Sequence, residues 1–136
     1  MIHNTGIGSQ MANALPQVRA TTIGDDGNET APTENRSSMV KWIPQNLEWA
    51  WLYERLTELA VEANYETWGF DLVSAPENIQ YTEYYASEDG HYDWHQDIGA
   101  GELPSKRKVS ITLQLSDSDE YEGGELQLTG GGDGAG

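Results

Sequence analysis

The stretch MVKWIPQNLEWAWLYERLTELAVEAN, residues 39–64, changes its hydrophobic period at Pro44. Residues 39–43 are typical of a strand, which Pro44 should end because proline has no N–H to give to a ladder. Asn46 then predicts a helix N-cap. The apolar residues that follow recur at helical spacing: Trp49, Leu52, Tyr53, Leu56, Ala60 and Ala63. We therefore expect a helix that ends near Asn64 and packs its aromatic side chains into the core.

The pattern becomes strand-like after residue 65. We expect strands over 69–72, 79–85, 91–97, 108–115 and 124–128, with a turn at 87–90 and a loop at 98–106. Residues 108–115 alternate between apolar and polar side chains, which is typical of a half-buried strand. On the N-terminal side, residues 5–20 suggest a short helix and a strand, and 21–38 an exposed loop. A helix followed by closely spaced strands predicts an α+β fold with an antiparallel sheet or barrel.

The composition limits the classes of function. A chain of 136 residues is one ordinary domain, and it contains no cysteine. Its 23 acidic residues outnumber its 7 basic ones and give a net charge of −16, which disfavours nucleic acid as a partner. No apolar run approaches the roughly 18 residues of a membrane span. The first residues also lack a signal-peptide pattern, so we expect no membrane partner and a cytoplasmic location.

The stretch GHYDWHQD, residues 90–97, contains two H-x-D triplets, His91–Asp93 and His95–Asp97. Residues two apart in a strand project to the same side, about 6.6 Å apart along the chain. Either pair could therefore bring an imidazole and a carboxylate to one divalent ion such as Fe(II), Mn(II) or Zn(II). The spacing alone does not choose between the two pairs.

Several ordered motifs around these triplets resemble the Fe(II)/2-oxoglutarate-dependent dioxygenases, specifically the prolyl 4-hydroxylase-like branch. They are YYASEDGHYDWHQDIG at 84–99, a loop, and RKVSITLQLSDSDEYEGGELQL at 107–128, which includes the E-G-G-x-L motif at 122–126. The resemblance covers residues 79–128 closely. It implies a double-stranded β-helix, or jelly-roll, with supporting N-terminal helices.

The resemblance also assigns roles to residues. It places His95 and Asp97 on Fe(II), because Tyr92 then falls at the family's cosubstrate-binding position. It implies that Tyr85, Thr112 and Gln114 line the 2-oxoglutarate pocket beside Tyr92. The activity implied is hydroxylation of a C–H bond of a protein residue or small molecule, with O2 as co-reactant and ascorbate as a family cofactor.

Two parts of the family site have no counterpart in the sequence. No histidine follows His95 and no lysine or arginine follows Lys108, whereas the family uses a distal His ligand and a basic residue that holds the far carboxylate of 2-oxoglutarate. We therefore expect a chain truncated at its C-terminus, with an irregular part at 1–38, a strand and helix at 39–66 and half of the β-core at 67–136. We expect it to bind iron weakly and turn over little 2-oxoglutarate. The alternative is an inactive acidic jelly-roll that serves as a binding module.

Overall fold

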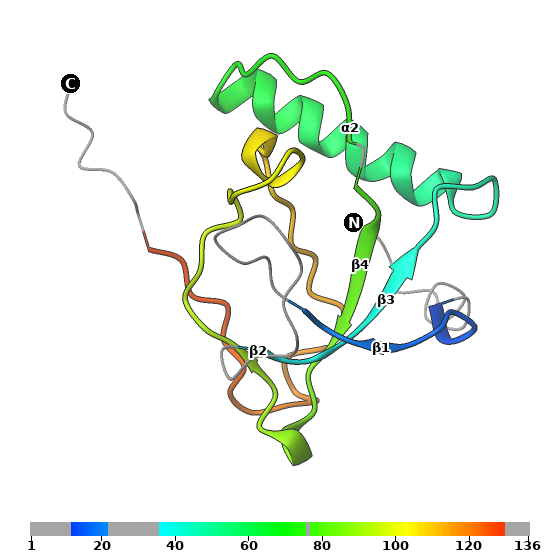
Figure 1. The fold of residues 1–136 in the computed structure, drawn as a ribbon, viewed down its shortest axis with the longest axis vertical. Helices are drawn as coiled ribbons and strands as arrows, with labels where there is room; N and C mark the ends of the chain where they lie inside the picture. The colour runs from blue at the N-terminus through cyan, green and yellow to red at the C-terminus, as the bar shows by residue number, and fades with distance from the viewer. Residues whose placement is uncertain (1–11, 22–35, 76, 130–136) are drawn as a thin grey trace.

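The computed structural model describes residues 12–21, 36–75 and 77–129. Within these ranges the fold is α+β, with one long helix and two small antiparallel sheets (Figure 1). The strands are β1 (Val18–Arg19), β2 (Arg36–Ser37), β3 (Met39–Ile43), β4 (Ile79–Glu83) and β5 (His91–Tyr92). The helices are α2 (Ala50–Thr67) and the short 3-10 turns η1 (Ala86–Glu88) and η2 (Pro104–Lys106). The α+β class predicted from the sequence is confirmed.

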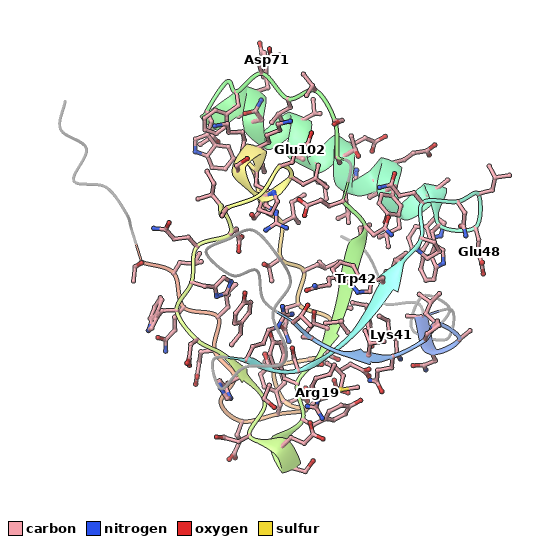
Figure 2. All side chains as sticks on the ribbon, in the orientation of Figure 1. Arg19, Lys41, Trp42, Glu48, Asp71 and Glu102 are labelled. Carbon is pink, nitrogen blue, oxygen red and sulfur yellow. The ribbon has the colours of Figure 1, made fainter. Side chains whose placement is uncertain are left out.

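The strand predicted at residues 39–43 is confirmed as β3, which is the centre of the larger sheet. It pairs antiparallel with β4 from Met39↔Glu83 to Ile43↔Ile79, and with β1 through Val18↔Val40. Lys41 on β3 and Arg19 on β1 are labelled in Figure 2, where the two strands run side by side. The smaller sheet consists of β2 and β5.

The helix predicted near residues 47–64 is confirmed as α2, shifted by three residues toward the C-terminus. Asn46 accepts a hydrogen bond from the Trp49 N–H at 3.2 Å and so caps the turn that leads into it. Tyr53 joins α2 to the end of the sheet, since its hydroxyl donates to the Ile43 carbonyl at 2.6 Å and accepts from the Ile79 N–H at 2.9 Å. The core therefore lies between α2 and the β3–β4 ladder, around Ala12, Ile43 and Trp49.

The strand predicted at residues 69–72 is wrong, because a side chain takes the backbone groups that a ladder would need. Gly69 ends α2 in the left-handed region with φ +71°, and its N–H donates to the Asn64 carbonyl at 2.7 Å. The Asn64 side chain then brackets Phe70, donating to its carbonyl and accepting from its N–H at 2.8 and 2.9 Å. With both groups satisfied locally, Phe70 has no need of a neighbouring strand.

The strands predicted at 108–115 and 124–128 are also absent from the described residues, and the strand predicted over 91–97 is limited to His91–Tyr92. No described segment pairs with 108–115, and its apolar side chains Ile111, Leu113 and Leu115 are 44–47% exposed. Alternation gives a segment two faces, but a strand also requires a hydrogen-bonding neighbour. The loop predicted at 21–38 is corrected at its end, where Arg36–Ser37 form β2.

The sequence predictions for the N-terminal segment, the polar loop and the C-terminal end concern residues that the structure describes only in part. Ala12 and Asn13 are helical and Val18–Arg19 form β1, which agrees with a short helix followed by a strand. The rest of the N-terminal segment, most of the polar loop and the glycine-rich end lie outside the described residues. Across the parts that are described, no helix has the length and apolar character needed to cross a membrane.

Candidate metal centre

The smaller sheet places the predicted site against a buried arginine. β2 and β5 pair with Arg36 directly opposite Tyr92 and Ser37 opposite His91. The Arg36 guanidinium carbon lies 4.4 Å from the centroid of the Tyr92 ring. Side chains that face each other across an antiparallel pair are normal interaction partners, and a guanidinium over an aromatic ring is attracted by the ring's quadrupole.

Tyr92 connects this arginine to His95. The Tyr92 and His95 rings are stacked with centroids 3.6 Å apart and planes 13° from parallel. Burial raises the pKa of the Tyr92 phenol, nearby Asp97 and Tyr84 raise it further, and Arg36 opposes them. The phenol therefore stays protonated at neutral pH and can serve as a hydrogen-bond donor beside His95.

His95 and Asp97 converge, with Nε2 3.4 Å from Asp97 Oδ1. On the other side of the ring, Nδ1 lies 2.7 Å from the Asp93 carbonyl oxygen, which can only accept a hydrogen bond. Nδ1 must then carry the proton, so in the neutral ring Nε2 presents a lone pair toward Asp97. Histidines that bind metals commonly have this arrangement, with one nitrogen donating to a carbonyl and the other free for the ion.

An ion pair holds the backbone at Asp97. Arg107 Nη1 donates to the Asp97 carbonyl oxygen at 2.8 Å. The same guanidinium makes two hydrogen bonds to the Glu77 carboxylate, the one from Nε being 2.7 Å long. Glu77 thus fixes Arg107, and Arg107 fixes the main chain from which the Asp97 side chain projects.

This ion pair leads to a prediction about pH. The hydrogen bonds from Arg107 hold the pKa of Glu77 below its ordinary value of 4.5, and Glu77 correspondingly raises the pKa of Arg107. A depressed carboxyl pKa stabilises the fold above the unfolded value, and this stabilisation is lost as pH falls through the folded value. Glu77→Gln should therefore lower the unfolding free energy by up to about 1 kcal/mol at pH 7, a small value because both side chains are about one third exposed.

Urea denaturation at several pH values measures this difference. The gap between the wild type and Glu77→Gln should close below pH 4.5. Glu102→Gln is a matched control, because it removes an exposed carboxylate whose contact with Lys106 is 3.7 Å long. A gap that persists unchanged at pH 3 would contradict the assignment of the stabilisation to the ionised Glu77.

The other sequence-predicted site residues are more dispersed. The Tyr85 hydroxyl accepts a hydrogen bond from Gln17 at 3.1 Å. Thr112 is exposed and borders a hollow beside α2 with Val109 and Ile111, and Gln114 is exposed. Among the described residues, no hydrogen bond, ion pair or ring stacking joins Tyr85, Thr112 or Gln114 to His95. Their place in a cosubstrate pocket remains a prediction, whereas Tyr92 lies directly against His95.

The first triplet is arranged differently from the second. His91 Nδ1 lies 2.6 Å from the Asp89 carbonyl oxygen, and His91 itself pairs with Ser37 across the sheet. In the second triplet an imidazole nitrogen lies close to a carboxylate oxygen, with His95 Nε2 3.4 Å from Asp97 Oδ1. In the ranges that the structure describes, no group of three or more His, Cys, Asp or Glu side chains could share a metal ion.

Sequence reasoning missed the roles of Arg36, Glu77 and Arg107. Arg36 and Glu77 lie in segments without a recognisable motif, and they reach the site through β2–β5 pairing and an ion pair that spans 30 residues. The scarcity of basic residues could have indicated the two arginines. The chain has 7 basic residues, so an arginine next to a predicted strand is a candidate for a specific contact.

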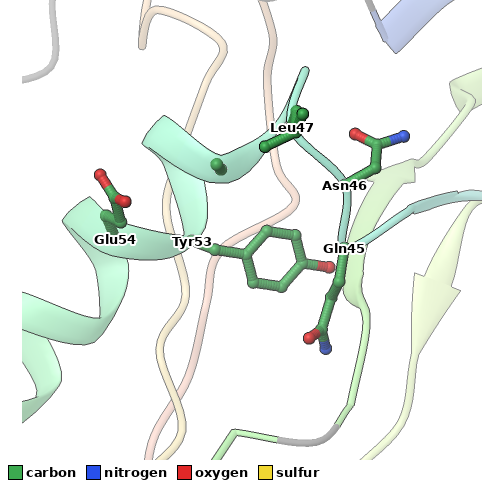
Figure 3. Close-up of a pocket in the computed structure, with 6 residues that line it drawn as sticks. Gln45, Asn46, Leu47, Tyr53 and Glu54 are labelled. Carbon is green, nitrogen blue, oxygen red and sulfur yellow. The ribbon is translucent and has the colours of Figure 1, made fainter.

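A second hollow lies at the start of α2, away from the candidate metal centre (Figure 3). Its lining is Gln45, Asn46, Leu47, Ala50, Tyr53 and Glu54. The Tyr53 hydroxyl there is already engaged by the Ile43 carbonyl and the Ile79 N–H. Glu54 is the one charged residue in the lining, so this hollow lacks the paired ligands found at His95 and Asp97.

Comparison of the chain with protein-family models, curated proteins and solved structures gives no match.

Proposed function

We propose that this chain carries the iron-binding segment of an Fe(II)/2-oxoglutarate-dependent dioxygenase of the prolyl 4-hydroxylase-like branch. The observation that carries the proposal is the approach of His95 Nε2 to Asp97 Oδ1, with His95 Nδ1 tied to a carbonyl. The ordered motifs around this pair support the same family. The jelly-roll core that the family implies is part of the proposal.

The donor set fits a borderline divalent ion. A neutral imidazole nitrogen and a carboxylate oxygen are ligands that Fe(II) accepts, and 3.4 Å is close enough for one ion to touch both at bond lengths of about 2.0–2.2 Å. Bound iron, with O2 and 2-oxoglutarate, would supply the oxidant that hydroxylates a C–H bond of a peptidyl residue or small molecule. Two ligands suffice for an ion to bind but fall one short of the family triad.

The chain's own residues have distinct tasks in this proposal. His95 and Asp97 hold the ion, and Asp93 sets the tautomer of His95 through its carbonyl oxygen. Tyr92 covers one face of the His95 ring and offers its phenolic O–H as a donor to a bound carboxylate. Arg107 anchors the Asp97 backbone. Because the described chain contributes two ligands, we expect weak iron binding and little conversion of 2-oxoglutarate to succinate.

The second candidate function is the acidic binding module without catalysis. It is favoured by the absence of a third ligand among the described residues and by the net charge of −16. The two proposals differ in whether His95 and Asp97 bind a metal ion.

The substitution pair Asp97→Asn and Asp93→Asn separates the two. Asp97→Asn should lower the affinity for Mn(II), used as a stand-in for Fe(II), by about tenfold or more, since an amide oxygen is a much weaker ligand than a carboxylate. Asp93→Asn is the control. It makes the same carboxylate-to-amide change at a neighbouring exposed residue and keeps the backbone carbonyl that bonds His95. Isothermal titration calorimetry in oxygen-free buffer measures the Mn(II) affinity of each variant. Equal affinities in the two variants would refute the dioxygenase site.

A further inference from the structure

Arg36 is a buried cation without a carboxylate partner among the described residues. It is 7% exposed. Five of the seven basic residues form an ion pair with a glutamate: Arg19, Lys41, Arg55, Lys106 and Arg107. The sixth, Lys108, is exposed to solvent. Arg36, the most buried arginine, thus has no carboxylate partner in residues 12–21, 36–75 and 77–129.

Within the described part of the chain, the hydrogen bonds of Arg36 all go to neutral groups. Nε donates to Ser38 Oγ at 3.0 Å, Nη1 to the Thr21 carbonyl at 3.3 Å and Nη2 to Gln80 Oε1 at 3.0 Å. A guanidinium has five N–H donors, so one on each terminal nitrogen has no acceptor among the described residues. Removing a charge from water without a paired ion is costly, which indicates that a group outside these contacts completes the site.

The position of Arg36 connects it to the candidate metal centre. The His95 ring covers one face of Tyr92 at 3.6 Å, so the Arg36 guanidinium at 4.4 Å lies over the opposite face. A ligand from solvent would reach Arg36 next to the Gln80 side chain, which contacts Arg36 Nη2. The residues on either side of Gln80, Ile79 and Tyr81, pack into the core, so the Gln80 side chain points to the other face of β4, where it is exposed.

We propose that Arg36 and Gln80 bind one carboxylate group of a small dicarboxylate. The two remaining N–H groups of Arg36 match the two oxygens of a carboxylate, and the Gln80 amide adds a further donor. The proposal of an anion site rests on the burial and neutral partners of Arg36 and does not depend on the proposed function. The choice of a dicarboxylate rests on the proposed function, because its cosubstrate 2-oxoglutarate carries two carboxylates.

The test uses the 136-residue chain stripped of metal and titrated with succinate, a dicarboxylate that lacks the 2-oxo group. Replacing Arg36 would break hydrogen bonds to three segments, so the variant chosen is Gln80→Glu at an exposed position. The new carboxylate would occupy the anion site from within the chain. We expect Gln80→Glu to raise the melting temperature and to weaken succinate binding by about tenfold or more. Gln127→Glu, also exposed, adds the same charge elsewhere and is the control.

Each outcome bears on the proposal. Saturable succinate binding by the wild type and Gln127→Glu, lost in Gln80→Glu and kept in His95→Ala, supports it. No binding by the wild type, equal binding by Gln80→Glu and Gln127→Glu, or a melting temperature for Gln80→Glu no higher than that of Gln127→Glu would overturn it. Because no metal is present, failure of the iron-binding proposal appears in the Asp97→Asn titration and leaves this result unaffected.

Discussion

His95→Ala should abolish specific binding of divalent metal ions to this chain. The substitution removes the Nε2 lone pair that faces Asp97 Oδ1 at 3.4 Å, and an isolated carboxylate that is about half exposed holds such ions no better than the many other acidic side chains. Removing a group that merely orients a ligand commonly costs 10–100-fold in metal affinity, so losing the ligand itself should cost at least about 100-fold. Titration with Mn(II), followed by the electron paramagnetic resonance of the free ion, measures the loss.

His91→Ala is the matched control for this experiment. His91 belongs to the other H-x-D triplet, and its ring nitrogen is likewise bonded to a carbonyl two residues earlier. We expect His91→Ala to keep most of the wild-type affinity. Loss of binding in His91→Ala with retention in His95→Ala would show that the first triplet holds the metal.

Trp49→Ala should have the largest effect on stability. Trp49 is 2% exposed and packs with Ile43 and Ala12 in the core between α2 and the sheet. Deleting a buried tryptophan side chain typically costs about 3–5 kcal/mol, because apolar area is lost and a cavity remains. A domain of this size has a total stability of about 5–15 kcal/mol, so most of the margin could be removed.

Urea denaturation followed by far-ultraviolet circular dichroism measures this cost without relying on tryptophan fluorescence. Trp51→Ala provides the comparison, since Trp51 lies two residues away, stacks on Trp49 and is 45% exposed. We expect it to lose roughly 1 kcal/mol or less. Equal losses in both variants would contradict the placement of the core on the Trp49 side of α2.

The elements that could be predicted are those whose signals are local. Pro44 ends β3, and the helical spacing after Asn46 sets the face of α2 that packs on the sheet. The end of α2 was harder to predict, because Asn64 is helical and also supplies the side chain that caps Phe70. The segment 108–115 has a strand's alternation, but no neighbour among the described residues pairs with it, and pairing is a property of two segments.

In the candidate site, too, local features could be predicted from the sequence and contacts between distant segments could not. The H-x-D spacing made His95 and Asp97 one of two candidate pairs, and the family resemblance selected it, although both residues lie beyond the end of β5. The Arg36–Tyr92 contact depends on the register of β2 and β5, which lie more than 50 residues apart in the chain. The buried guanidinium with neutral partners could not have been inferred from composition, because burial is decided by the fold.

Nitrogen-15 spectra of the histidine rings test the central claim most directly. Zn(II), a diamagnetic stand-in for Fe(II), is added to the labelled chain, and the two ring nitrogens of each histidine are followed separately. We predict that Nε2 of His95 shifts on metal binding while its Nδ1 remains protonated on the Asp93 carbonyl, and that the His91 ring is unaffected. A shift at His91, or no shift at His95 at saturating Zn(II), would contradict the assignment of His95 and Asp97 as metal ligands.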